Sequence, residues 1–254
     1  MPRMFSAQEV ESFRSNGYVV MRQLATPKTV QAMRVLATTA LATEAEPVEY
    51  EADVHYPGAP PSRTAPGRHT VRRLLQAYAR APVFRDWALG TPLAEHLQQL
   101  LGPDILLAQA HHNCIMTKQP RYSSMTHWHQ DIRYWAFERP ELVSVWLALG
   151  PERVENGGLL LVSGSQAMPL TPAQFDEAKF FRTDLPQNQP LLATHVTVEL
   201  EAGDVLFFHC RTLHAAGRNE TDATKFSVVF TYHAADNHPL ANTRSADTPE
   251  VVVV

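Results

Sequence analysis

The sequence predicts a mainly β protein with helices in its N-terminal part, and three observations carry this prediction. From about residue 142 onward, short apolar runs alternate with clusters of Gly, Pro and Asn, a pattern typical of β-sandwiches and barrels. Before residue 105, the chain instead carries helix start and stop signals. The 254 residues, 44% of them hydrophobic and 19% charged, suffice for one domain with a full core. We therefore expect a single domain over 1–254, with a helical part at 1–104 and a β core at 105–235.

Two helices and a strand are predicted at the start of the chain. Ser6 begins a capping-box pattern, and the helix that follows is expected to end at Gly17. The apolar run 18–24 is typical of a strand. Thr26 and Pro27 then provide an N-cap and a first helical residue for a second helix.

The remaining N-terminal residues alternate between irregular and helical patterns. Residues 46–67 contain five prolines and little periodicity, which favours an exposed, mobile flap. Helical spacing recurs at 70–79 and 92–101, and Gly102 ends the second of these segments. The β core is expected to begin with the run 105–118. Later strands are expected at 142–149, 158–162, 194–200, 204–209 and 225–233.

Charge and cysteine content narrow the class of protein. A net charge of −4 without a Lys or Arg cluster gives no reason to expect a nucleic-acid or membrane partner. Cys114 and Cys210 are too few for a disulfide framework. The first residues lack the apolar core of a secretory signal, and no apolar run approaches ~18 residues. We therefore expect a cytoplasmic protein.

The segment HWHQD at 127–131 combines two imidazoles with a carboxylate. On an extended strand, the period of two directs His129 and Asp131 to one face and Gln130 to the other. His214, which follows the apolar run 204–209, is the candidate for a third ligand. Two imidazoles and one carboxylate on one face of a metal ion, with other positions open, form the site of non-haem Fe(II) oxygenases. A lone His-x-Asp pair is also common as a hydrogen-bonded surface pair, so the metal prediction depends on His214 meeting the other two.

Lys225 and Ser227 lie two positions apart in a predicted strand and therefore share one face. A cation and a hydroxyl beside an open Fe(II) site suit a dicarboxylate, because the lysine pairs with one charged end and the hydroxyl adds a hydrogen bond. The pair predicts a binding site for an acidic co-substrate.

Several segments, in the same order along the chain, resemble one family. The resemblance is to the phytanoyl-CoA dioxygenase family of Fe(II)- and 2-oxoglutarate-dependent oxygenases, and it covers most of the chain. It is carried by an N-terminal helix and strand, a first-ligand segment with the tryptophan strand that follows, a turn region and a distal-histidine region, which read FSAQEVESFRSNGYVVMRQL, HQDIRYWAFERPELVSVWLALG, ENGGLLLVSGSQ and AGDVLFFHCRTLHAAGRN.

The resemblance implies a double-stranded β-helix of the jelly-roll, cupin-like type with a flap over its mouth. It implies a metal triad of His129, Asp131 and His214 that holds Fe(II), with 2-oxoglutarate and O2 as co-substrates. The implied reaction is hydroxylation of an aliphatic C–H bond of a small molecule, with release of succinate and CO2.

The resemblance also implies how 2-oxoglutarate is bound. Trp146 would lie in the wall of its site, and Lys225, with Ser227, would hold its far carboxylate where the family usually has an arginine. Lysine is a point charge without the bidentate fork of arginine, which leaves Arg218 as the alternative clamp. A second departure is Gln166, which replaces the histidine of the family's Ser-His turn.

Four further residues are candidates for substrate contacts. His111 and Asn113 interrupt an apolar strand and would point the same way, with a hydrogen-bonded core histidine as the alternative for His111. Trp135 is predicted to be core or cavity wall. His127 is expected to contact the substrate or to orient a ligand, since a fourth protein ligand would close the open metal site.

The basic residues near these motifs divide into two groups. Arg133 is a candidate for contact with an anionic substrate. Arg72 and Arg73 are interpreted as solvated charges on a helix face, and Lys118 as the cap of a strand.

Three other functions are weighed against hydroxylation. A halogenase requires an open position where Asp131 supplies a ligand, so hydroxylation is preferred. A non-catalytic cupin-like module that binds a metal or a small acid is kept as the alternative, because Lys225 replaces the arginine. A zinc hydrolase using the same triad would be active without oxygen.

Overall fold

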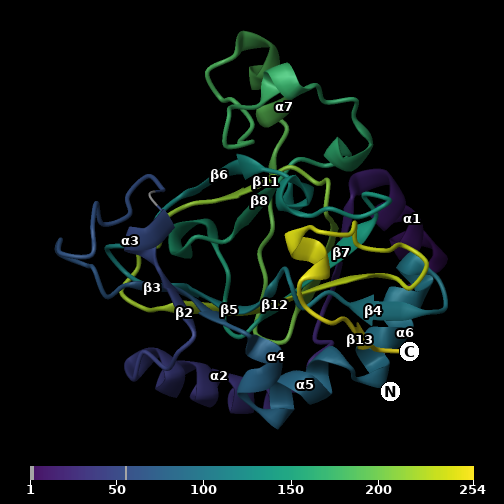
Figure 1. Ribbon diagram of the computed structural model, residues 1–254, viewed down its shortest axis with the longest axis horizontal. Coiled ribbons are helices and arrows are strands. Elements are labelled where there is room, and N and C mark those ends of the chain that lie inside the picture. The colour runs from purple at the N-terminus through teal and green to yellow at the C-terminus, as the bar shows by residue number, and fades with distance from the viewer. Residues whose placement is uncertain (1–2, 55) are drawn as a thin grey trace.

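The computed structural model describes residues 3–54 and 56–254, and it consists of two β-sheets with helices packed on the outer face of the larger one (Figure 1). The helices are α1 (Ala7–Asn16), α2 (Pro27–Ala42), α3 (Glu51–Val54), α4 (Ala77–Arg80), α5 (Pro82–Ala88), α6 (Thr91–Leu101) and α7 (Gln189–Leu192). The strands are β1 (Tyr18–Met21), β2 (Val48–Tyr50), β3 (Val71–Leu75), β4 (Ile105–Leu107), β5 (Asn113–Lys118), β6 (Thr126–His129), β7 (Leu142–Ala148), β8 (Leu159–Leu161), β9 (Val196–Thr197), β10 (Val205–His209), β11 (His214–Ala216), β12 (Lys225–Ala234) and β13 (Val251–Val252).

Both sheets are antiparallel throughout their pairings. The larger sheet runs in the order β1-β10-β7-β12-β5-β3-β2, and β4 pairs with β12 and β13. The smaller sheet runs β6-β11-β8-β9 and lies opposite the larger one (Figure 1). Helices α2, α4, α5 and α6 cover the other face of the larger sheet (Figure 1). The mainly β, jelly-roll fold predicted from the sequence is confirmed.

Strand β7 shows how the sheet creates two compartments. All seven of its residues are buried, because both faces of the sheet are covered. Val143, Val145 and Leu147 belong to the core shared with the helices, whereas Trp146 belongs to the core between the two sheets. The period of two therefore sends alternate residues of one strand to the helices and to the space between the sheets.

The predicted start signals of helices α1 and α2 are confirmed. Ser6 and Glu9 form the capping box of α1, and Gly17 ends this helix in the left-handed region. Thr26 caps α2, with Pro27 as its first residue. The predicted strand at 18–24 is present but ends at Met21.

The interpretation of 70–79 as helix was wrong. Residues Val71–Leu75 form strand β3, which pairs with β2 and β5, and only α4 is helical. A short apolar run does not determine its own period, and pairing with distant strands decided it. The exposed flap predicted at 46–67 is also wrong in part, since β2 lies within it and Tyr50 and Glu51 are buried. The N-terminal part thus supplies strands β1 to β3 to the larger sheet.

Gly17 is the position where α1 packs on the turn that precedes β11. Its φ is +81°, and a Cβ added there would lie 2.4 Å from Oε1 of Gln166 and 2.5 Å from Oγ1 of Thr212. Replacing Gly17 with alanine is expected to lower the free energy of unfolding by about 1–3 kcal/mol. Urea denaturation measures this loss. Gly150→Ala is the matched control, because the added Cβ there meets only Arg34 at 3.4 Å, and equal losses for both variants would contradict the explanation.

Among the residues that the structure describes, we find no helix with the length and apolar character needed to cross a membrane.

Candidate metal centre

Three side chains predicted from the sequence meet between the two sheets. His129 is the last residue of β6 and His214 the first of β11, and the antiparallel register places them directly opposite each other. Their rings lie 4.1 Å apart between centroids. Oδ1 of Asp131 is 3.7 Å from Nε2 of His129 and 3.5 Å from Nε2 of His214. All three residues are buried, and their ligand atoms lie within 4.8 Å of one another.

Backbone carbonyls hold both imidazoles in one tautomer. Nδ1 of His129 donates to the carbonyl of His127 at 2.8 Å, and Nδ1 of His214 donates to that of Thr212 at 3.0 Å. Because a carbonyl only accepts, each ring carries its proton on Nδ1 and presents the lone pair of Nε2. Burial and the neighbouring His214 hold the pKa of His129 well below its ordinary value, which keeps this ring neutral.

The carboxylate is oriented in a similar way. Asp131 begins a 3₁₀ helix, η1 (Asp131–Tyr134), and its Oδ2 accepts from Oγ of Ser144 on β7 at 3.0 Å. Oδ1 is left to face both histidines. Two imidazoles that present Nε2 and one carboxylate, each held by a hydrogen bond from outside the triad, fit a divalent transition metal.

His112 is a neighbour of this triad that the sequence did not single out. Its Nδ1 lies 3.7 Å from Oδ2 of Asp131, and burial lowers its pKa. Strand β5 begins only at Asn113, so the alternation used to pair His111 with Asn113 does not extend to the histidines. His112 and His111 both line the cavity, whereas Asn113 does not.

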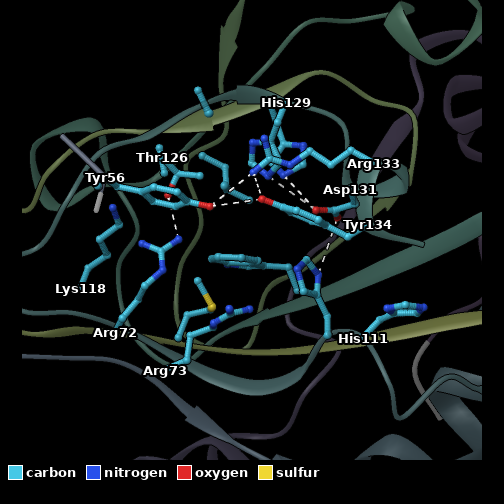
Figure 2. A pocket seen from close by; sticks show the side chains of 18 of the residues that line it. Tyr56, Arg72, Arg73, His111, Lys118, Thr126, His129, Asp131, Arg133 and Tyr134 are labelled. Atoms are coloured by element: carbon cyan, nitrogen blue, oxygen red, sulfur yellow. Dashed lines mark hydrogen bonds and ion pairs between the residues drawn. The ribbon is translucent and has the colours of Figure 1, made fainter. Parts of the chain in front are cut away.

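A cavity of about 160 Å³ lies beside the triad (Figure 2). Strands of both sheets contribute to its wall, together with η1 and the 3₁₀ helix η6 (Arg244–Ala246). Among the described residues, Asp131 is the only acidic side chain in the lining. The cationic side chains of the lining are Arg72, Arg73, Lys118, Arg133, Lys225 and Arg244.

Glu152 accepts hydrogen bonds from three of the residues that the sequence assigned to the co-substrate site. It is fully buried, and its Oε2 accepts from Nζ of Lys225 at 3.0 Å. Its Oε1 accepts from Oγ of Ser227 at 2.6 Å and from Nε1 of Trp146 at 2.8 Å. Lys225 and Trp146 line the cavity, but Ser227 does not. The expectation of a direct contact between Ser227 and the co-substrate is therefore corrected: its hydroxyl holds Glu152 and accepts from Lys225 at 3.2 Å.

Three other predicted residues lie outside the cavity lining. The guanidinium of Arg218 donates to the carbonyls of Ser123 and Arg121, so it is tied to a loop and is not an alternative clamp. Asn113 uses its Oδ1 to accept from the backbone N–H of Tyr78 at 2.8 Å. His127 acts on the triad through its carbonyl. Trp135 does line the cavity, with its ring stacked on His111 at 5.0 Å between centroids.

Arg72 and Arg73 lie on strand β3 and not on a solvated helix face, so their interpretation from the sequence was wrong. Arg72 is only 6% exposed, with Nε 3.3 Å from Oε1 of Glu49 and Nη1 3.7 Å from Oε2 of Glu51. Arg73 donates to Glu49 through Nε at 2.8 Å. Buried charges require such partners, and the acids that supply them lie in β2 and α3, which the sequence had assigned to a flap.

Lys118 lines the cavity directly opposite Lys225 in the register of β5 and β12. Its Nζ donates to the carbonyls of Ser124 and Gly217 and forms no ion pair with any described residue. Burial, reinforced by the nearby charge of Arg72, lowers the pKa of Lys118 to about 7. Met116 and Lys118 are two positions apart in β5 and therefore share the face of the strand that lines the cavity. This alternation was the signal available in the sequence for the orientation of Lys118.

The low pKa of Lys118 predicts a dependence of stability on pH. Between about pH 7 and its ordinary value of 10.5 the unfolded chain binds this proton and the folded chain releases it, so stability rises with pH. We expect the free energy of unfolding to gain on the order of 3 kcal/mol from this group between pH 7 and pH 10. Chemical denaturation of the wild type and of Lys118→Met at both pH values isolates the contribution. An identical pH dependence in the two proteins would contradict it.

Comparisons with known proteins identify the family of this chain. The family model described as phytanoyl-CoA dioxygenase (PhyH) matches residues 13–227. A protein named ectoine dioxygenase from Bordetella parapertussis is 22% identical over 254 residues, covering 91% of this chain and 76% of the relative. The peroxisomal phytanoyl-CoA dioxygenase of Rattus norvegicus is 24% identical over 256 residues, covering 92% of this chain and 70% of the relative.

Solved structures give the same result for the fold. The crystal structure of EctD from S. alaskensis with 2-oxoglutarate and 5-hydroxyectoine has a TM-score of 0.76 and 20% identity, covering 93% of this chain and 78% of that one. The epimerase SnoN in complex with Fe³⁺, α-ketoglutarate and nogalamycin RO has a TM-score of 0.74 and 23% identity, covering 95% and 89%. The family match spans most of the sequence, and this chain belongs to the phytanoyl-CoA dioxygenase (PhyH) family.

Proposed function

We propose that this protein is an Fe(II)- and 2-oxoglutarate-dependent dioxygenase that hydroxylates an aliphatic C–H bond of a small molecule and releases succinate and CO2. The observation that carries the proposal is the buried triad, in which two Nε2 lone pairs and one carboxylate oxygen converge. The membership of the family and the cavity beside the triad support it.

His129, Asp131 and His214 would hold Fe(II). When bound, Fe(II) together with 2-oxoglutarate and O2 supplies the oxidising power for C–H hydroxylation. The carbonyls behind both imidazoles and the hydroxyl of Ser144 keep the three ligand atoms in place. The buried position of the triad excludes water from this face of the metal site.

Lys225 would bind the far carboxylate of 2-oxoglutarate, and Trp146 would form part of the wall of that site. Glu152 fixes the ammonium of Lys225 from behind and at the same time balances its charge. Lys118, opposite Lys225, has no acidic partner among the described residues, and with a pKa of about 7 it is only partly protonated at neutral pH. A carboxylate bound at this end of the cavity would favour the protonated form of Lys118, so that both lysines could take the place of one arginine fork.

We also propose a cytoplasmic location. Cys114 and Cys210 are both buried thiols and do not form a disulfide with each other, as expected in a reducing compartment.

Anaerobic titration tests the proposed function. The protein should develop a weak visible charge-transfer band only when Fe(II) and 2-oxoglutarate are both present, and admission of O2 should then yield succinate. Zn²⁺ in place of Fe(II) is the control and should give neither the band nor succinate. Binding of the two without succinate formation would favour the non-catalytic module. Turnover that requires zinc and no oxygen would favour the hydrolase.

A further inference from the structure

Arg133 is a cavity-lining cation without an acidic partner. Its guanidinium lies between two aromatic rings, 3.7 Å from the centroid of Phe180 and 4.2 Å from that of Tyr134. The groups to which it donates are the hydroxyls of Tyr56 and Tyr134 and the carbonyl of Ala178, and all three are neutral. Its Nε is buried without any acceptor. Within residues 3–54 and 56–254, no carboxylate forms an ion pair with this charge.

Of the other five cationic side chains of the lining, three have acidic partners, Lys118 donates to backbone carbonyls, and Arg244 is exposed. Arg72 and Arg73 pair with Glu49, and Lys225 pairs with Glu152. Arg133 as a whole is half-buried, but its Nε is fully buried and has no acceptor. Because a buried polar group of a charged side chain is costly without a partner, this guanidinium marks the η1 side of the cavity as a place for an anion.

Two tyrosine hydroxyls lie next to the guanidinium of Arg133. The hydroxyls of Tyr56 and Tyr134 lie 3.5 Å apart, and both accept from Arg133 (Figure 2). The hydrogen bond between the two hydroxyls uses the hydrogen of only one of them. The hydrogen of the other hydroxyl is therefore free to donate to a ligand. Tyr134 is 51% exposed, and its partial burial together with the hydrogen bond to Tyr56 raises its pKa to about 12, so this hydroxyl keeps its proton at neutral pH. The cluster therefore offers N–H and O–H donors around one positive charge.

The cluster lies close to the metal ligands. The ring of Phe180, on which Arg133 stacks, is 6.0 Å from the ring of His129 between centroids. Arg133 itself follows Asp131 by two residues in η1. An anion held here would place its adjoining carbon atoms next to the triad. The stacked rings of Trp135 and His111 form an apolar part of the wall of the same cavity.

We propose that Arg133, Tyr134 and Tyr56 form a subsite for the carboxylate of the primary substrate, a small organic acid. This inference rests on the proposed function, because the carboxylate is placed relative to the iron site. Charge-assisted donors and hydroxyls together suit a carboxylate. The volume of about 160 Å³ is below the ~300–1,000 Å³ of most ligand pockets, which favours a compact acid over an acyl thioester of a nucleotide carrier.

Anaerobic calorimetry on the Fe(II)- and 2-oxoglutarate-loaded protein tests the subsite with matched probes. The probes are butyrate, cyclohexanecarboxylate and phenylacetate, each with its primary amide, and inorganic phosphate. At least one acid should bind about tenfold or more tightly than its amide, because a hydrogen bond to a charged group is worth more than one to a neutral group. When O2 is then admitted, that acid should also increase the rate of succinate formation. Equal affinity for every acid and its amide, no binding of any acid, or tighter binding of phosphate would overturn the proposal.

Three variants test whether the preference for the acid over its amide comes from Arg133 and the tyrosine hydroxyls beside it. Arg133→Gln should reduce the preference for the acid to less than about threefold, while the charge-transfer band with 2-oxoglutarate persists. Tyr134→Phe keeps the ring under the guanidinium and should weaken acid binding about fivefold. Arg68→Gln removes the same charge from an exposed arginine outside the cavity lining and should leave the preference unchanged. Retention of the full preference in Arg133→Gln would overturn the proposal.

The same measurements separate this inference from the proposed function. Acid binding is repeated on metal-free protein, where the cluster is still present. A wild type that binds the acids but shows no charge-transfer band would contradict the oxygenase and keep the carboxylate subsite. A wild type that shows the band and forms succinate but does not distinguish acids from amides would contradict the subsite alone.

Discussion

Asp131→Ala is expected to remove Fe(II) binding and to lower succinate formation more than about a hundredfold. Its Oδ1 is the carboxylate oxygen that faces Nε2 of both His129 and His214. Loss of a residue that only orients a metal ligand already costs about 10–100-fold, so loss of the ligand itself should cost more. Metal content after gel filtration and succinate formation under saturating 2-oxoglutarate measure the two effects, with circular dichroism as the check on folding.

Ser144→Ala is the graded comparison for this prediction. It removes the hydrogen bond to Oδ2 of Asp131 and leaves the carboxylate in place. We expect metal affinity to fall about 10–100-fold in this variant. Full turnover by Asp131→Ala, or equal losses in the two variants, would show that Asp131 is not a ligand.

Lys225→Met is expected to have two separable effects. The first is on stability: Glu152 is fully buried, and loss of its ammonium partner leaves an uncompensated charge, which costs about 3–5 kcal/mol of unfolding free energy. The second is on function: the 2-oxoglutarate concentration needed to develop the charge-transfer band should rise more than about tenfold. Urea denaturation and anaerobic titration measure them independently.

The double variant Lys225→Met with Glu152→Gln separates the two effects. The amide of glutamine removes the buried negative charge and still accepts from Ser227 and Trp146. Most of the lost stability should therefore return, while binding of 2-oxoglutarate stays weak. If the double variant regained 2-oxoglutarate binding as well, Lys225 would be a structural partner of Glu152 and the clamp would lie elsewhere, with Lys118 as the remaining cation at that end.

The sequence by itself determined the features that depend on local period and on side-chain chemistry. The caps of α1 and α2 follow from hydrogen bonds within a few residues, and the capping box at Ser6 was predicted correctly for that reason. The proximity of His129 and Asp131 follows from alternation across an extended Gln130. His214 was found by its place after an apolar strand and by the resemblance of its surroundings to the family.

Only the tertiary structure decided which charges are buried and which partners they have. Strand β3 pairs with β5 some forty residues later, and that pairing turned Arg72 and Arg73 from expected surface charges into cavity residues. Glu152 lies after β7 in an isolated β-bridge with Leu200 and has no local signal in the sequence, yet it accepts from residues of β7 and β12. The burial of these charges depends on the partners that the fold brings within about 4 Å, because electrostatic energy is set by distance and dielectric environment. Those partners lie too far away in the sequence to be read from local patterns.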